Sequence, residues 1–210
     1  MNLSYEKVIA QIDIDGFLKQ LRAIYASMDL KYSEAAAYYG FNCTGCEDNC
    51  CLTRFYHHTV LEYLCILEGF HILDPEKQTE TRAKALEVRR KSVEADRKGK
   101  RLRQMCPLNS DGKCILYSYR PMICRLHGIP HELHKPGQGI AYGLGCEVFS
   151  KQLGEKDYYR FDRTPFYIKM AALEKDLKQA AGITTKVKMT VADMVLYSGS
   201  KFHGSRFKVN

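Results

Sequence analysis

Tryptophan is absent from this sequence of 210 residues, so the large aromatic side chains of any core must come from its 14 Tyr and 9 Phe residues. A long apolar run is also missing. The most apolar stretch, VLEYLCILEGF, is interrupted by Glu62 and Glu68 and is shorter than the roughly 20 residues that a membrane-spanning helix needs. We therefore expect no membrane among the partners of this protein.

The N-terminal region lacks the uninterrupted apolar segment of a secretion signal, because Glu6, Asp13 and Asp15 fall where that segment would lie. We therefore predict a cytoplasmic location, where thiols are kept reduced and clustered cysteines usually bind metal or take part in redox chemistry. The nine cysteines are an odd number, which also argues against a framework made only of disulfides.

The composition is that of a globular domain, with 45% hydrophobic and 27% charged residues. Apolar residues recur at steps of three and four from Ile14 to Met28, and again across residues 60–72, which predicts two helices with one buried side each. Between them, Ser33 and Gly40 have the character of a cap and a stop, so we expect a short separate helix there.

Two further helices are predicted from their ends. Asp74 is suited to cap a helix that has Pro75 in its first turn and meets no breaker before Gly99. Thr164 and Gly182 bound another helix in the same way. A short helix is also expected in the segment TVADMVLYS.

The predicted fold class is mainly α. We expect a single helical domain over residues 1–181, in which long irregular loops converge on a thiolate metal centre, and a basic C-terminal extension over residues 182–210. The loops are expected at 41–55 and 104–149, since the region between Cys106 and Cys146 is rich in Gly and Pro.

Eight of the nine cysteines fall into two groups. The first has the spacing C-x2-C-x3-C-C, and the second has gaps of seven, nine and twenty-one residues. The candidate metal ligands are Cys43, Cys46, Cys50, Cys51, Cys106, Cys114, Cys124 and Cys146. Four thiolates suit one zinc ion at tetrahedral corners, and they equally suit an iron–sulfur cluster, over whose irons they are distributed. The remaining thiol, Cys65, fits an apolar helical stripe and is expected to be a small core residue.

The division of these eight thiols stays open at this level. The side chains of the adjacent Cys50 and Cys51 diverge, so both do not easily serve one tetrahedral ion. Two four-thiolate sites, or one cluster with some thiols left over, are equally compatible with the spacing. Arg120 and Arg125 flank Cys124, and we predict that their guanidinium groups compensate the negative charge of a bound centre and donate to its sulfurs.

The segments CTGCEDNCC and CPLNSDGKCILYSYRPMICR, followed by Cys146, resemble the bacterial YkgJ-type cysteine-cluster family, described as a zinc- or iron-chelating domain. The family pattern is C-x2-C-x2-C-C, then a Cys-Pro-Leu segment, then Cys-x-Ile-Tyr ahead of Arg-Pro-x-x-Cys-Arg. Here one extra residue stands between Cys46 and Cys50, and Ser118 replaces a usual acidic residue. The longer CEDNCC is similar to the cysteine segment of the flagellin lysine-N-methylase branch, which is associated with an iron–sulfur cluster.

Three functions follow as hypotheses. The first is a metalloprotein that holds an iron–sulfur cluster, of the 4Fe–4S type, in a redox or accessory enzymatic role; it rests on Cys106-Pro107, on the adjacent cysteines and on the resemblance. The second is a structural zinc module that binds a protein or nucleic acid through a basic helix at 79–103. The third is an S-adenosylmethionine-dependent protein methyltransferase, which the resemblance alone implies.

The net charge of +8 is concentrated in two segments. Residues 79–103 hold ten Lys or Arg against four acidic residues, and residues 182–210 hold five against one. Such a helix can contact phosphates, but no aromatic residue interleaves it as a base-stacking platform. The histidines at 57, 58, 127, 131 and 134 are interpreted as loop residues, with supplementary metal ligation as the alternative.

Overall fold

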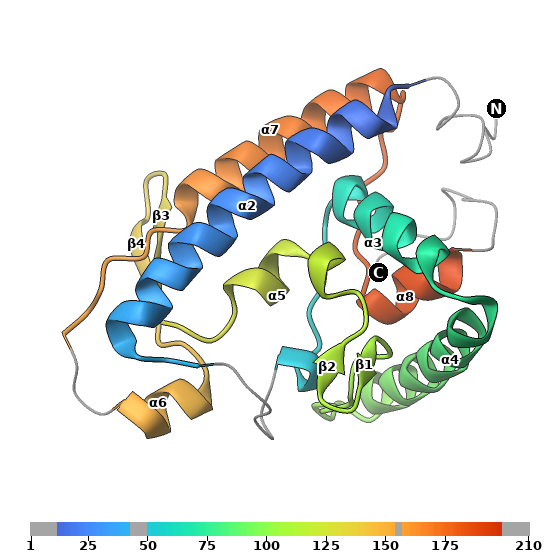
Figure 1. Ribbon diagram of the computed structural model, residues 1–210, viewed down its shortest axis with the longest axis horizontal. Helices are drawn as coiled ribbons and strands as arrows, with labels where there is room; N and C mark the ends of the chain where they lie inside the picture. Colours follow the sequence, from blue (N-terminus) through green and yellow to red (C-terminus); the bar gives the residue numbers. More distant parts are fainter. Residues whose placement is uncertain (1–11, 43–49, 154–156, 199–210) are drawn as a thin grey trace.

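The computed structural model describes residues 12–42, 50–153 and 157–198, and within these residues the protein is mainly α (Figure 1). The α-helices are α2 (Ile14–Tyr39), α3 (Val60–Ile72), α4 (Pro75–Arg97), α5 (Met122–Leu126), α6 (Glu147–Leu153), α7 (Thr164–Ala180) and α8 (Val191–Tyr197). Two 3-10 turns are η1 (Cys50–Leu52) and η2 (Tyr117–Tyr119). Four short strands are β1 (Asn109–Ser110), β2 (Lys113–Cys114), β3 (His131–Lys135) and β4 (Gly139–Gly143).

The longest helix, α2, runs alongside α7 in Figure 1. Asp13 caps it by accepting a hydrogen bond from the Gly16 N–H at 2.9 Å, and Gly40 ends it in the left-handed conformation at φ 66°. The prediction of a separate helix starting at Ser33 is wrong, because α2 continues through this residue without a break. A cap requires non-helical backbone, and the alanines that follow Ser33 are strong helix formers that favour continuation.

Helix α3 is the central element of the core. Nearly all of its side chains are buried, including Cys65 at 1% exposure, so the prediction that this thiol is a core residue is confirmed. The N-terminus of α3 is capped from another helix: the Glu174 carboxylate of α7 accepts the N–H groups of Val60 and Leu61 at 2.9 and 3.1 Å. A carboxylate at this end also complements the helix dipole.

Helix α4 begins as predicted, with the Asp74 side chain accepting from the Lys77 N–H at 2.7 Å and Pro75 in the first turn. It packs against α8. The described part of the expected extension, residues 182–198, joins the same core as the rest of the chain, and five of its apolar residues are buried there: Val187, Met189, Ala192, Met194 and Val195.

The region between the two terminal cysteines of the second group is more ordered than expected. Asp111 and Gly112, at φ 52° and 82°, form the turn between β1 and β2, as their sequence predicts. A second antiparallel hairpin pairs β3 with β4 and carries His131 and His134, so these two lie on a strand and the loop interpretation is wrong for them.

No helix in the described part of the chain is long and apolar enough to cross a membrane.

Candidate metal centre

Five described thiols border one cavity of about 740 Å³, which lies among η1, the β1–β2 hairpin and α5. They are Cys50, Cys51, Cys106, Cys114 and Cys124. The cavity is far larger than one metal ion, since a water molecule takes about 30 Å³ in the liquid. The structure therefore brings together thiols from both sequence groups at one place.

Backbone contacts hold these thiols in position. The Cys106 N–H donates to the Cys51 carbonyl at 2.8 Å, which joins the two cysteine groups directly. The β1–β2 register places Cys114 opposite Asn109, whose N–H donates to the Cys106 carbonyl at 3.0 Å. The turn at Asp111 and Gly112 therefore returns the chain so that Cys106 and Cys114 border the same cavity.

The thiols influence one another electrostatically. Burial raises the pKa of Cys106 and of Cys124 well above the ordinary value, and the negative charge of Cys51 and Cys114 raises both further. Burial also raises the pKa of Cys114 to about 11. The pKa of Cys51 falls to about 6, because a hydrogen bond from the Cys50 thiol and one from Asn109 outweigh the opposing effect of burial. The four thiols thus border one cavity and interact electrostatically.

The sulfur atoms are nevertheless not packed as tightly as around one ion. Among the described residues, no three thiols have their ligand atoms within 4.8 Å of one another. No disulfide joins any two of the described cysteines.

Cys146 lies apart from this cavity. Its N–H donates to the Gly128 carbonyl at 2.9 Å, and its Sγ accepts a hydrogen bond from the Phe149 N–H at 3.4 Å. Cys43 and Cys46 fall outside the described residues. The prediction that they are ligands therefore stays a prediction.

Arg125 lies behind the thiols, and its guanidinium group is 5% exposed. It donates to the carbonyls of Arg120 and Ser118, binds the Asp29 carboxylate at 2.5 Å, and stacks on the Tyr25 ring at 4.1 Å. These contacts tie α5 to α2 and to the turn before α5. Arg125 thus lines the cavity while its donors are occupied by the protein.

Arg120 also lines the cavity, and it differs from Arg125 in one respect. Its guanidinium group covers the Tyr117 ring at 3.8 Å and reaches Asp29 at 3.3 Å. Its Nε is buried and has no hydrogen-bond partner among the described residues. Its positive charge lowers the pKa of Cys114 and of Cys124, which burial raises.

One more buried donor atom bordering the cavity is in the same situation. His57 Nε2 has no hydrogen-bond partner within the described part of the chain. A buried polar group without a partner costs about 1–3 kcal/mol, so each such group calls for an explanation.

His57 is held firmly on its other side. It is 2% exposed, and its backbone exchanges two hydrogen bonds with Met189 at 2.7 and 2.9 Å. Its Nδ1 lies 3.8 Å from Glu62 Oε1. The same carboxylate accepts from the Met122 N–H at 3.0 Å and from the Thr59 hydroxyl at 2.7 Å.

The charge on Glu62 is stabilised in spite of its burial. Burial opposes ionisation, but the interactions with His57, Thr59 and the Met122 N–H outweigh it and hold the pKa of Glu62 below its usual value. The cysteine motifs did not indicate Glu62, Asp29 or Asn109 as residues of this site, because none of the three belongs to such a motif.

His127 lines the same cavity, next to the Phe55 ring. Burial and the charge of Arg163 lower its pKa, which favours the neutral ring.

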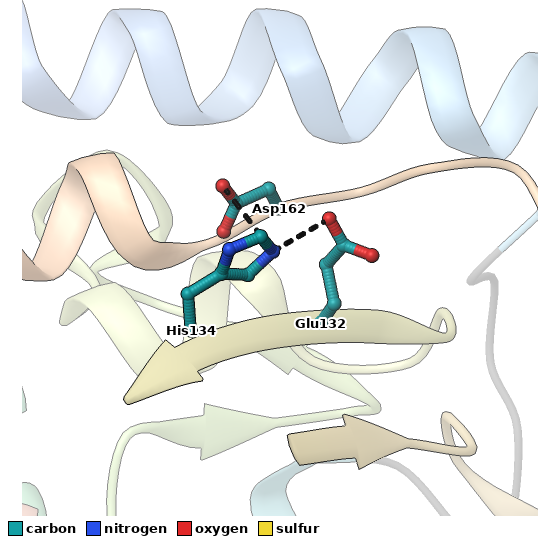
Figure 2. Close-up of side chains that lie close together, drawn as sticks. All are labelled: Glu132, His134 and Asp162. Atoms are coloured by element: carbon teal, nitrogen blue, oxygen red, sulfur yellow. Dashed lines mark hydrogen bonds and ion pairs between the residues drawn. The ribbon is translucent and has the colours of Figure 1, made fainter. Parts of the chain in front are cut away.

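A second group of ligand-type side chains lies at the β3–β4 hairpin, where Glu132 and His134 of β3 lie close to Asp162 (Figure 2). Their ligand atoms lie within 4.8 Å of one another. Glu132 Oε1 already accepts from His134 Nε2 and from Arg160 Nε, each at 2.9 Å, and Asp162 accepts from the Thr164 N–H at 2.8 Å. The group is therefore satisfied as an ion-pair network that joins β3 to the start of α7.

The basic charge of α4 is largely compensated within the structure. Glu80, Glu87 and Glu94 each pair with basic residues one helical turn away, for example Lys84 with Glu80 at 2.6 Å and Lys98 with Glu94 at 2.6 Å. This pattern is typical of a solvent-exposed helix stabilised by its own ion pairs.

In comparisons with known proteins, this chain matches no family model, no curated protein and no solved structure.

Proposed function

We propose that Cys51, Cys106, Cys114 and Cys124 hold an iron–sulfur cluster of the 4Fe–4S type, and that the protein has a redox or accessory enzymatic role. The observation that carries the proposal is the shared cavity: four thiols from four separate segments border it and influence one another electrostatically. Four cysteine thiolates are the usual ligand set of such a cluster.

The spacing of the sulfurs favours a cluster over a single zinc ion. Zn–S bonds of about 2.3 Å at tetrahedral corners place the four sulfurs only about 3.8 Å apart. No three described thiols approach to within 4.8 Å of one another. A cluster spreads its thiolates over several irons, so it accepts a wider arrangement.

The surroundings suit a sulfur-rich anion. Arg120 brings a positive charge to the cavity wall, and its buried Nε is a donor without a protein partner in the described residues. The side chain of Asn109 donates to the Cys51 thiol and lowers its pKa. Hydrogen bonds to cluster sulfurs and nearby charges set the reduction potential of iron–sulfur centres, so these residues would tune the centre that the thiols hold. When bound, such a cluster supplies one-electron transfer.

The test is the metal content of protein purified without oxygen. We expect a brown sample with broad absorbance, containing iron and acid-labile sulfide in equal amounts. Colourless protein with tightly bound zinc would support the zinc module instead, and protein with neither metal would refute both.

The ninth cysteine offers a matched control. Cys114→Ala is expected to lose most of the iron and sulfide, whereas Cys65→Ala removes a thiol that the core buries away from the cavity and is expected to keep them. Equal iron loss in both variants would contradict the assignment, because the loss would then follow from destabilisation alone.

A further inference from the structure

The buried His57 ring borders the thiol cavity and lies beside the Glu62 carboxylate. His57 is one of the residues that line the cavity, and it is almost completely buried. Its backbone is fixed by the bridge to Met189, so the ring is held at the end of α3 rather than on a mobile loop. Its Nε2 has no hydrogen-bond partner in the described residues.

Glu62 links this ring to the cysteine-bearing helix. One of its oxygens lies 3.8 Å from His57 Nδ1 and accepts the N–H of Met122, two residues before Cys124 in α5. The other oxygen accepts from the Thr59 hydroxyl. The carboxylate therefore fixes the position of the ring relative to the segment that carries Cys124.

A carboxylate on the Nδ1 side of a histidine selects the tautomer with a proton on Nδ1 and orients the ring. Metal sites use this arrangement to present the other nitrogen to the centre. When the Nε2 side of such a ring also faces an anion, Nδ1 and Nε2 each donate a hydrogen bond to the anion beside them.

We propose that His57 donates a hydrogen bond from Nε2 to a sulfur atom of the centre held by the cavity thiols, and that Glu62 is the positioning residue that orients the ring. This inference rests on the function proposed above. It adds a residue outside every cysteine segment to the site, and it assigns a partner to a buried nitrogen that has none in the described part of the protein.

The direct test needs no substitution. Anaerobically purified protein, labelled with ¹⁵N only in histidine, is reduced and examined by pulsed EPR. We expect a weak ¹⁵N coupling to the reduced centre, as a histidine hydrogen-bonded to a cluster sulfur produces. A cluster without histidine coupling would refute the role of His57 and leave the cluster assignment intact.

The adjacent histidine provides a matched control for the variants. His58 contacts the carbonyl of Val187 at 3.2 Å and is not among the residues that line the thiol cavity. His57→Leu is expected to abolish the coupling and shift the reduction potential to more negative values, because a donor to the reduced centre is lost. His58→Leu is expected to change neither.

Glu62→Gln separates positioning from packing. It preserves the size of the side chain but removes the charge that orients the ring, so we expect the ¹⁵N coupling to weaken while the iron content stays close to that of the wild type. An unchanged coupling would refute the positioning role. If His57→Leu does not fold, coupling that persists in labelled His127→Leu supports the main proposal, and absence of coupling in the labelled wild-type protein refutes it. Wild-type protein that binds neither iron nor zinc refutes it together with the proposed function.

Discussion

Replacement of Arg125 by Met tests whether this buried guanidinium group holds the wall of the thiol cavity together. The wild-type side chain makes hydrogen bonds to two backbone carbonyls and to Asp29, and it stacks on Tyr25. Methionine has a similar length and fills much of the space, but it donates to none of these groups.

The expected loss is dominated by the backbone contacts. A hydrogen bond from a charged group contributes about 1.5–3 kcal/mol, and the two carbonyls of Ser118 and Arg120 lose such a donor at once. The ion pair adds less than 1 kcal/mol, because the Asp29 side chain is 40% exposed and solvent screens it. The stacking on Tyr25 adds about 0.5–1 kcal/mol. Together these contributions predict that Arg125→Met lowers the free energy of unfolding by about 4–8 kcal/mol.

Thermal unfolding monitored by circular dichroism measures this loss. At about 2–4 °C per kcal/mol for a chain of this size, the melting temperature should fall by roughly 8–32 °C. The control is Arg90→Met, which removes an arginine that is 64% exposed and paired with Glu87 on the surface. It should leave the melting temperature almost unchanged, because solvent screens such an exposed surface pair. A loss for Arg125→Met no larger than that of the control would refute the reasoning.

Two more predictions concern stability. The hydrogen bonds from His134 and Arg160 lower the pKa of Glu132 in the folded protein. The stabilisation from the Glu132 carboxylate is therefore complete above the unfolded pKa of about 4.3, and it is lost as the pH falls through the lower pKa of the folded state. Glu132→Gln should therefore be less stable at pH 7 and show a shallower fall in melting temperature between about pH 5 and pH 3; parallel pH profiles would contradict this. Gly69→Ala should lower the free energy of unfolding, measured with urea, by about 1–2 kcal/mol. The added Cβ would lie 2.5 Å from Tyr119 Cγ, and this clash outweighs the helix-forming advantage of alanine. A more stable variant would disprove the close packing of α3 against η2.

Local sequence was enough to predict most of the helices and the core. Asp74 and Pro75 mark the start of α4, and Gly40 marks the end of α2, because capping and left-handed glycine act within a few residues of the chain. The apolar spacing around Cys65 correctly predicted a buried thiol. The separate helix at Ser33 was wrong for a related reason: a residue that can cap does so only where the backbone leaves the helix, and here it does not.

The composition of the candidate site depended on tertiary structure. The spacing of the cysteines indicated a thiol-rich centre, but it did not show that Cys51, Cys106, Cys114 and Cys124 share a cavity from which Cys146 is excluded. That division arises from contacts between distant segments, such as the hydrogen bond from Cys106 to Cys51.

The same holds for the groups around the thiols. The position of Glu62 between His57 and the backbone at Met122 follows from how α3 packs against α5, and no local pattern announces it. Sequence alone determined which side chains are able to bind a metal and which stretches form helices, because both depend on residue type and short spacing. Packing decided which of those side chains meet, because burial and hydrogen bonding between distant segments are properties of the whole fold.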